Sequence, residues 1–91
     1  MSNWIVTTES GRVYRRVRGG VQVEGVDYYR NPMIRFLAWD EDTNPHEVAW
    51  ATASEGEPEI GHRVYLSTVG AGWRLSTPIA RVEWDDDVFQ G

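Results

Sequence analysis

Hydrophobic and polar residues alternate along most of this chain, with the period of β-strands rather than of helices. The first such segment, residues 4–8, is β-branched and aromatic, and the second, residues 12–18, alternates valine with arginine and tyrosine. Residues 9–11 separate the two with the length of a hairpin turn. Gly-Gly at 19–20 then leads into a third segment at 21–23. The pattern predicts that the first three strands form an antiparallel meander.

Three later segments have the same character. Residues 33–39 are apolar enough for a largely covered strand, residues 63–69 alternate, and residues 73–84 form a long strand that contains Pro78. Proline cannot donate a hydrogen bond to a neighbouring strand, and the hydrophobic positions change parity across this residue. The sequence therefore predicts a β-bulge at Pro78.

The segment at residues 45–55 fits two structures. In favour of a helix, Asn44, Pro45 and Glu47 have the order of an N-cap, a first-turn proline and a capping glutamate. In favour of a strand, larger residues alternate with alanines throughout the segment. Both structures remain open, and a strand is slightly favoured.

Together these elements predict an all-β fold, a small barrel or sandwich of six to seven short antiparallel strands, with one short helix near 45–55 as an option. The 91 residues are enough for one β domain, 1–91, and five tryptophans give it a substantial core. The acidic residues at 85–91 are expected to form a frayed tail.

Composition excludes several classes of protein. The chain has no cysteine, which rules out a disulfide framework, a cysteine-ligated zinc site and a thiol nucleophile. It shows no signal-peptide pattern, and no window reaches the ~18 apolar residues that a membrane span needs. We therefore expect a cytoplasmic protein with no membrane partner.

The candidate catalytic and metal motifs are incomplete. Residues 40–44 match the start of a calcium-binding loop, but Pro45 stands where that loop needs glycine and Ala51 where it needs glutamate. His46 and His62 have no metal-binding spacing, and no serine lies in a nucleophile-elbow motif. We expect no metal, no cofactor, no catalytic residues and no enzymatic activity.

The charge is unevenly placed, and this directs attention to the second strand. The chain has a net charge of −5, yet residues 1–37 hold six arginines and three acidic residues. If the valines of residues 12–18 face the core, the outer face carries four side chains: Arg12, Tyr14, Arg16 and Arg18. Arginine beside an aromatic ring can hold an anionic group or stack a base. The alternative is that the acidic second half of the chain neutralises these arginines, and Arg15, on the valine face, is expected at a rim or in an ion pair.

A second candidate site lies just before Pro78. It consists of Trp73, Arg74, Ser76 and Thr77. The expected kink would leave backbone donors unpaired beside hydroxyl groups and a guanidinium, so the segment could hold an anion or a partner's strand. Ordinary packing is the alternative.

Three stretches of the chain, residues 8–14, 55–61 and 74–83, resemble short uncharacterised β-rich proteins of actinobacteria and their phages. The resemblance implies an origin and no mechanism. Each stretch also has a structural explanation: a hairpin turn, a loop before a strand, and a bulged last strand.

These observations favour a small non-enzymatic binding module, derived from a phage or mobile element, that inhibits or scaffolds another macromolecule. A protein is the expected partner, and strand edges with five tryptophans also favour a homodimer. The alternative is a protein that binds a nucleotide or single-stranded nucleic acid through the arginine and aromatic face. The net charge opposes general binding of duplex nucleic acid, whose affinity comes from neutralising many phosphates.

Overall fold

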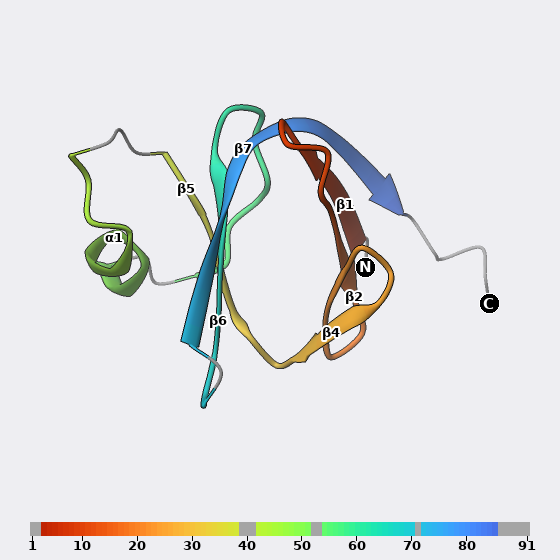
Figure 1. The fold of residues 1–91 in the computed structure, drawn as a ribbon, viewed down its shortest axis with the longest axis horizontal. Helices are drawn as coiled ribbons and strands as arrows, with labels where there is room; N and C mark the ends of the chain where they lie inside the picture. The colour runs from red at the N-terminus through yellow and green to blue at the C-terminus, as the bar shows by residue number, and fades with distance from the viewer. Residues whose placement is uncertain (1–2, 39–41, 52–53, 71, 86–91) are drawn as a thin grey trace.

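Seven antiparallel strands form one sheet that curls into a half-barrel, with one short helix beside it (Figure 1). The structure, a computed structural model, describes residues 3–38, 42–51, 54–70 and 72–85. The elements in chain order are β1 (Asn3–Thr8), β2 (Val13–Val17), β3 (Gly20–Val23), β4 (Asp27–Arg30), β5 (Met33–Leu37), α1 (Pro45–Ala51), β6 (Arg63–Thr68) and β7 (Gly72–Asp85). The predicted all-β class with one short helix is confirmed.

The sheet order is β4-β3-β2-β1-β7-β6-β5, and β7 joins its two halves. The first part of β7 pairs with β6 up to Pro78, which lies opposite Arg63, and the second part pairs with β1 from Ile79, which lies opposite Thr8. The register shifts in both pairings next to this point, so the predicted bulge is confirmed. Figure 1 shows β7 arching from the β6 side of the sheet to the β1 side.

The predicted meander is present, with a shifted turn and an additional strand. Gly20 pairs with Val17, so the loop between β2 and β3 is Arg18-Gly19 and not the predicted Gly-Gly pair. Gly20 lies against β4 so closely that a Cβ atom there would collide with the carbonyl oxygen of Tyr29. Sequence periodicity did not reveal β4, because it is a short edge strand whose residues are mostly exposed.

The slight preference for a strand at residues 45–55 was wrong, because residues 45–51 form α1. The side-chain Oδ1 of Asn44 accepts hydrogen bonds from the backbone N–H groups of His46, at 3.0 Å, and Glu47, at 3.4 Å. This cap satisfies donors that the first helical turn would otherwise leave unpaired. The helix also buries Ala49 against Leu37 and Tyr65 of the sheet.

The described residues form two hydrophobic clusters, one on each side of the β5–β6 region. The main core fills the inside of the half-barrel and contains Trp4, Val6, Tyr14, Val21, Val23, Ile34, Val64, Leu66 and Ile79. The smaller cluster joins Leu37, Ala49 and Tyr65 beneath α1. Figure 1 shows α1 on the side of β5 and β6 that faces away from β1 and β2. The half-barrel therefore has an inner face with a packed core and an outer face partly covered by the helix.

Some of the predicted features lie outside the described residues. Most of the acidic tail, residues 86–91, lies outside them, whereas Asp85 is the last residue of β7. Residues 40 and 41, the first two of the calcium-like loop at 40–44, also lie outside them. Within the described residues, no helix has both the length and the apolar character that crossing a membrane requires.

Candidate functional site

The side chains of β2 point in the opposite direction to the prediction. Tyr14 is buried, with 1% of its surface exposed, while Arg15 is exposed on the outer face. Tyr14 lies directly opposite Val6 on β1 and Val23 on β3, and both of these valines are completely buried. A tyrosine ring removes more apolar surface from water than a valine does, so the tyrosine face of β2 forms the core face. The predicted outer face of arginines is therefore the inner face of the half-barrel.

This reversal divides the predicted arginine row into two parts. Buried Tyr14 occupies the middle of the inner face, so Arg12 lies at one end of β2 and Arg16 and Arg18 lie at the other. At about 3.3 Å per residue, roughly 20 Å of strand separates the first and last of these arginines. Each end has its own pocket.

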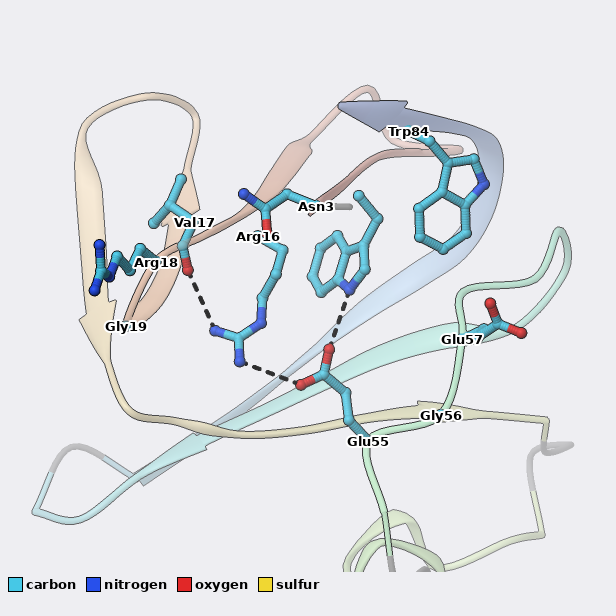
Figure 2. Close-up of a pocket in the computed structure, with 10 residues that line it drawn as sticks. Asn3, Arg16, Val17, Arg18, Gly19, Glu55, Gly56, Glu57 and Trp84 are labelled. Atoms are coloured by element: carbon cyan, nitrogen blue, oxygen red, sulfur yellow. Dashed lines mark hydrogen bonds and ion pairs between the residues drawn. The ribbon is translucent and has the colours of Figure 1, made fainter. Parts of the chain in front are cut away.

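The larger pocket, which we call the tryptophan pocket, has a volume of about 640 Å³ and lies at the Arg16 end (Figure 2). Its aromatic walls are Trp4 and Trp84, and its charged residues are Arg16, Arg18, Glu55 and Glu57. Trp84 is half exposed and lines one side. In Figure 2 the guanidinium of Arg18 lies on the opposite side from Trp84.

Glu55 organises the tryptophan pocket. One carboxylate oxygen lies 3.5 Å from Nη2 of Arg16, and the other accepts a hydrogen bond from Nε1 of Trp4 at 3.1 Å, as Figure 2 shows. The other terminal nitrogen of Arg16 donates to the carbonyl of Gly20 at 2.9 Å. Arg16 is thus tied into the structure, whereas Arg18 and Glu57 form no ion pair within the described residues. Sequence reasoning missed Glu55 as a site residue, because it lies in a loop 51 positions from Trp4 and the stretch 55–61 indicates only a loop before a strand.

The second pocket, which we call the arginine pocket, has a volume of about 290 Å³ and lies at the Arg12 end. It is lined by Ser10, Arg12, Tyr14, Arg74, Leu75, Ser76 and Thr77. The two candidate sites predicted separately from the sequence therefore meet in one place. Of the eight predicted residues, five line this pocket, two line the tryptophan pocket, and Trp73 lines neither.

A chain of hydroxyl groups closes one side of the arginine pocket. The Thr77 hydroxyl donates to Ser10 Oγ at 3.2 Å, and the backbone N–H of Ser10 donates to Thr77 Oγ1 at 3.1 Å. Ser10 Oγ lies 3.0 Å from the hydroxyl of Thr8, which donates to the carbonyl of Arg12 at 3.3 Å. These bonds attach the turn that precedes Arg12 to β7, which carries Arg74.

The arginine pocket is electropositive. Among the residues that the structure describes, no carboxylate lines it, and neither Arg12 nor Arg74 forms an ion pair. Nη1 of Arg74 is buried and has no hydrogen-bond partner, while the guanidinium carbon lies 5.6 Å from the centre of the Tyr29 ring. Burial raises the pKa of the Tyr14 phenol above its ordinary value of 10.0, against the opposing effect of Arg74 and Arg12. Tyr14 therefore keeps its proton at neutral pH.

Trp73 lies on the other face of β7, because neighbouring residues of a strand point to opposite sides. Its ring stacks on Tyr65, with centroids 5.7 Å apart and planes at 13°. Tyr65 in turn contacts His46 of α1, whose Nδ1 lies 3.0 Å from the tyrosine hydroxyl, and His46 Nε2 accepts a hydrogen bond from Trp50 at 2.9 Å. The prediction that Trp73 shares a site with Arg74 was therefore wrong.

The remaining histidine, His62, lies 3.7 Å from Glu59 in the loop before β6. Over the ranges that the structure describes, no group of three or more histidine, aspartate or glutamate side chains is placed to hold a metal ion.

In comparisons with protein-family models, curated proteins and solved structures, nothing matches this chain. The resemblance to actinobacterial and phage proteins therefore stays a prediction.

Proposed function

We propose that this chain is a non-enzymatic binding module that holds a segment of a protein partner in the tryptophan pocket. The observation that carries this proposal is the half-exposed Trp84 ring at a pocket of about 640 Å³. That volume lies within the range of about 300 to 1,000 Å³ typical of ligand sites. Tryptophan and arginine are also among the residues that most often contribute the largest part of the binding energy at protein interfaces.

The geometry of the pocket supports a partner with an apolar anchor side chain. Trp4 is held by its hydrogen bond to Glu55, so the pocket is largely formed before a partner arrives. Arg16 and Glu55 neutralise each other and shape the wall. Arg18 and Glu57 have no such partner among the described residues and are exposed, so they are available to one acidic and one basic group flanking the anchor.

The biological role belongs to the same proposal. The bound partner is inhibited or scaffolded in the cytoplasm, and the module derives from a phage or a mobile element. The resemblance of residues 8–14, 55–61 and 74–83 supports the origin.

A track for single-stranded nucleic acid has less support. Such tracks need a continuous positive groove with stacking rings along it. Here buried Tyr14 separates Arg12 from Arg16 and Arg18, so the arginines form no continuous groove on β2.

The test is retention of a partner from an extract of the native host by tagged protein, compared across matched variants. We expect Trp84→Ala and Arg18→Ala to lose the partner. Trp50→Ala, which removes an equally large exposed ring from α1, and Arg15→Ala, which removes an exposed charge from the outer face of β2, should retain it. If Trp50→Ala loses the partner and Trp84→Ala retains it, binding occurs at the helix face and the proposal fails.

A further inference from the structure

The arginine pocket holds two arginines, Arg12 and Arg74, that form no ion pair with any described residue. Both side chains line this pocket together with Tyr14, whereas Glu24, whose carboxylate opposes the effect of the two arginines on the pKa of Tyr14, does not line it. Nη1 of Arg74 is buried without a hydrogen-bond partner. A buried, unpaired donor on a charged group is costly, and native proteins seldom keep one without a ligand, an ion or a water to satisfy it.

The guanidinium of Arg74 and the backbone that carries Arg12 are also held in position. Arg74 lies over the Tyr29 ring, which restricts the plane of its guanidinium. The turn carrying Arg12 is attached to β7 by the hydrogen bonds between Ser10 and Thr77. Binding would therefore mainly require the exposed Arg12 side chain to become ordered, and a ligand gains affinity when the rest of its site is already formed.

Tyr14 supplies a third donor. Its side chain lines the pocket and its hydroxyl keeps its proton at neutral pH, so it can donate to an oxygen atom of a ligand. Ser76 does not contribute, because its hydroxyl already accepts from the backbone N–H of Val64 at 2.8 Å and donates to the carbonyl of Thr77 at 2.6 Å. The donors available to a ligand are therefore two planar guanidinium groups and one phenol.

Size and charge together identify the class of ligand. At about 290 Å³ the pocket is at the lower limit for ligand sites, so it suits one compact functional group and not a whole nucleotide. Two guanidinium groups match a group that carries nearly two negative charges and several acceptor oxygens, which a phosphate monoester does near neutral pH. Arg12 is exposed at the edge of the pocket, so the ester stem can leave past it toward solvent.

From these observations we propose that the arginine pocket is a binding site for a phosphate monoester, held by the guanidinium groups of Arg12 and Arg74 and by the hydroxyl of Tyr14. It lies at the opposite end of β2 from the tryptophan pocket and does not depend on the function proposed for that pocket.

The test is isothermal titration of the intact protein with inorganic phosphate, with O-phosphoserine and, as a singly charged comparison, with acetate. We expect both phosphate probes to bind and acetate to bind at least about tenfold more weakly. Arg12→Gln and Arg74→Gln should each weaken the binding of O-phosphoserine by about tenfold or more. Arg81→Gln is the matched control: it removes the same charge from β7 at an exposed position, where Arg81 is ion-paired with Glu83, so it should leave the affinity unchanged.

Several results would overturn the proposal. The proposal fails if O-phosphoserine does not bind at millimolar concentration, or if inorganic phosphate binds and O-phosphoserine does not. It also fails if Arg12→Gln and Arg81→Gln lose affinity equally. If Arg74→Gln does not fold, Arg12→Gln still decides the question, because its side chain is exposed. Trp84→Ala should bind O-phosphoserine normally, so failure of this proposal and failure of the proposed function can be told apart.

Discussion

Glu55 and Trp4, 51 positions apart in the chain, are joined by a hydrogen bond of 3.1 Å from the indole nitrogen to the carboxylate. The same carboxylate is ion-paired with Arg16 on β2. One loop side chain therefore fixes both a core tryptophan on β1 and the arginine beside it, and connects the loop before β6 to the meander.

We expect Glu55→Ala to lower the free energy of unfolding by about 1 to 2 kcal/mol, because it removes an acceptor from the buried Trp4 nitrogen and the partner of Arg16. Glu55→Gln keeps an acceptor for Trp4 and should cost less. Glu57→Ala, in the same loop and exposed, should change stability by less than about 0.5 kcal/mol. Urea denaturation followed by tryptophan fluorescence measures all three, and equal effects at the two glutamates would contradict the role assigned to Glu55.

A methyl group at position 20 should be strongly destabilising. A Cβ atom on Gly20 would collide with the carbonyl oxygen of Tyr29 and approach the Tyr28 ring to 2.9 Å, so β3 and β4 would have to separate. We expect Gly20→Ala to cost about 3 kcal/mol or more. Gly70→Ala is the control: its φ of +84° imposes backbone strain of about 1 to 2 kcal/mol, but no atom lies within 4 Å of the added group. Thermal unfolding that shows the smaller loss at Gly20 would contradict the close approach.

Stability should fall in alkaline solution because of Tyr14. Its pKa is raised in the folded protein, chiefly by burial, so above about pH 10 the folded state holds a proton that the unfolded chain releases. The contribution of Tyr14 to the free energy of unfolding is therefore complete below about pH 10, and it is lost as the pH rises through the raised pKa of the folded state.

The matching variant is Tyr14→Phe, which has no proton to lose. Between about pH 8 and about pH 11, the urea midpoint of the wild type should decline more steeply than that of the variant. If the urea midpoints of the two proteins decline in parallel, groups other than Tyr14 cause the loss of stability in alkaline solution.

The contact between His46 and Tyr65 should couple α1 to the sheet. His46 Nε2 accepts from Trp50, so the ring proton is on Nδ1 and is donated to the tyrosine hydroxyl. A double-mutant cycle of His46→Ala and Tyr65→Phe should give a coupling energy of about 1 kcal/mol. The same cycle with His62→Ala should give additive effects, because His62 lies 3.7 Å from Glu59 in its own loop. Additivity in both cycles would mean that the His46 contact contributes nothing to stability.

The sequence by itself determined the local features of this protein. Alternating hydrophobicity identified the strand character of the longer segments, the turn residues identified the meander, and Asn44 with Pro45 carried the signal for the start of α1 even though a strand was slightly favoured. The bulge at Pro78 followed from a missing N–H group and a change of parity. Each of these features depends on groups that are close together along the chain, so the residue pattern was sufficient to indicate them.

Only the tertiary structure decided which face of β2 is inside and which side chains form each pocket. Alternation shows that Val13 and Tyr14 point in opposite directions, but it cannot show which direction the core lies in. That depends on Val6 and Val23 of the neighbouring strands. The meeting of Arg12 with Arg74 likewise depends on β1 lying between β2 and β7 and on the hydrogen bonds between Ser10 and Thr77, 67 positions apart. Contacts over such distances form when the whole sheet closes around its core, and no short stretch of sequence carries that information.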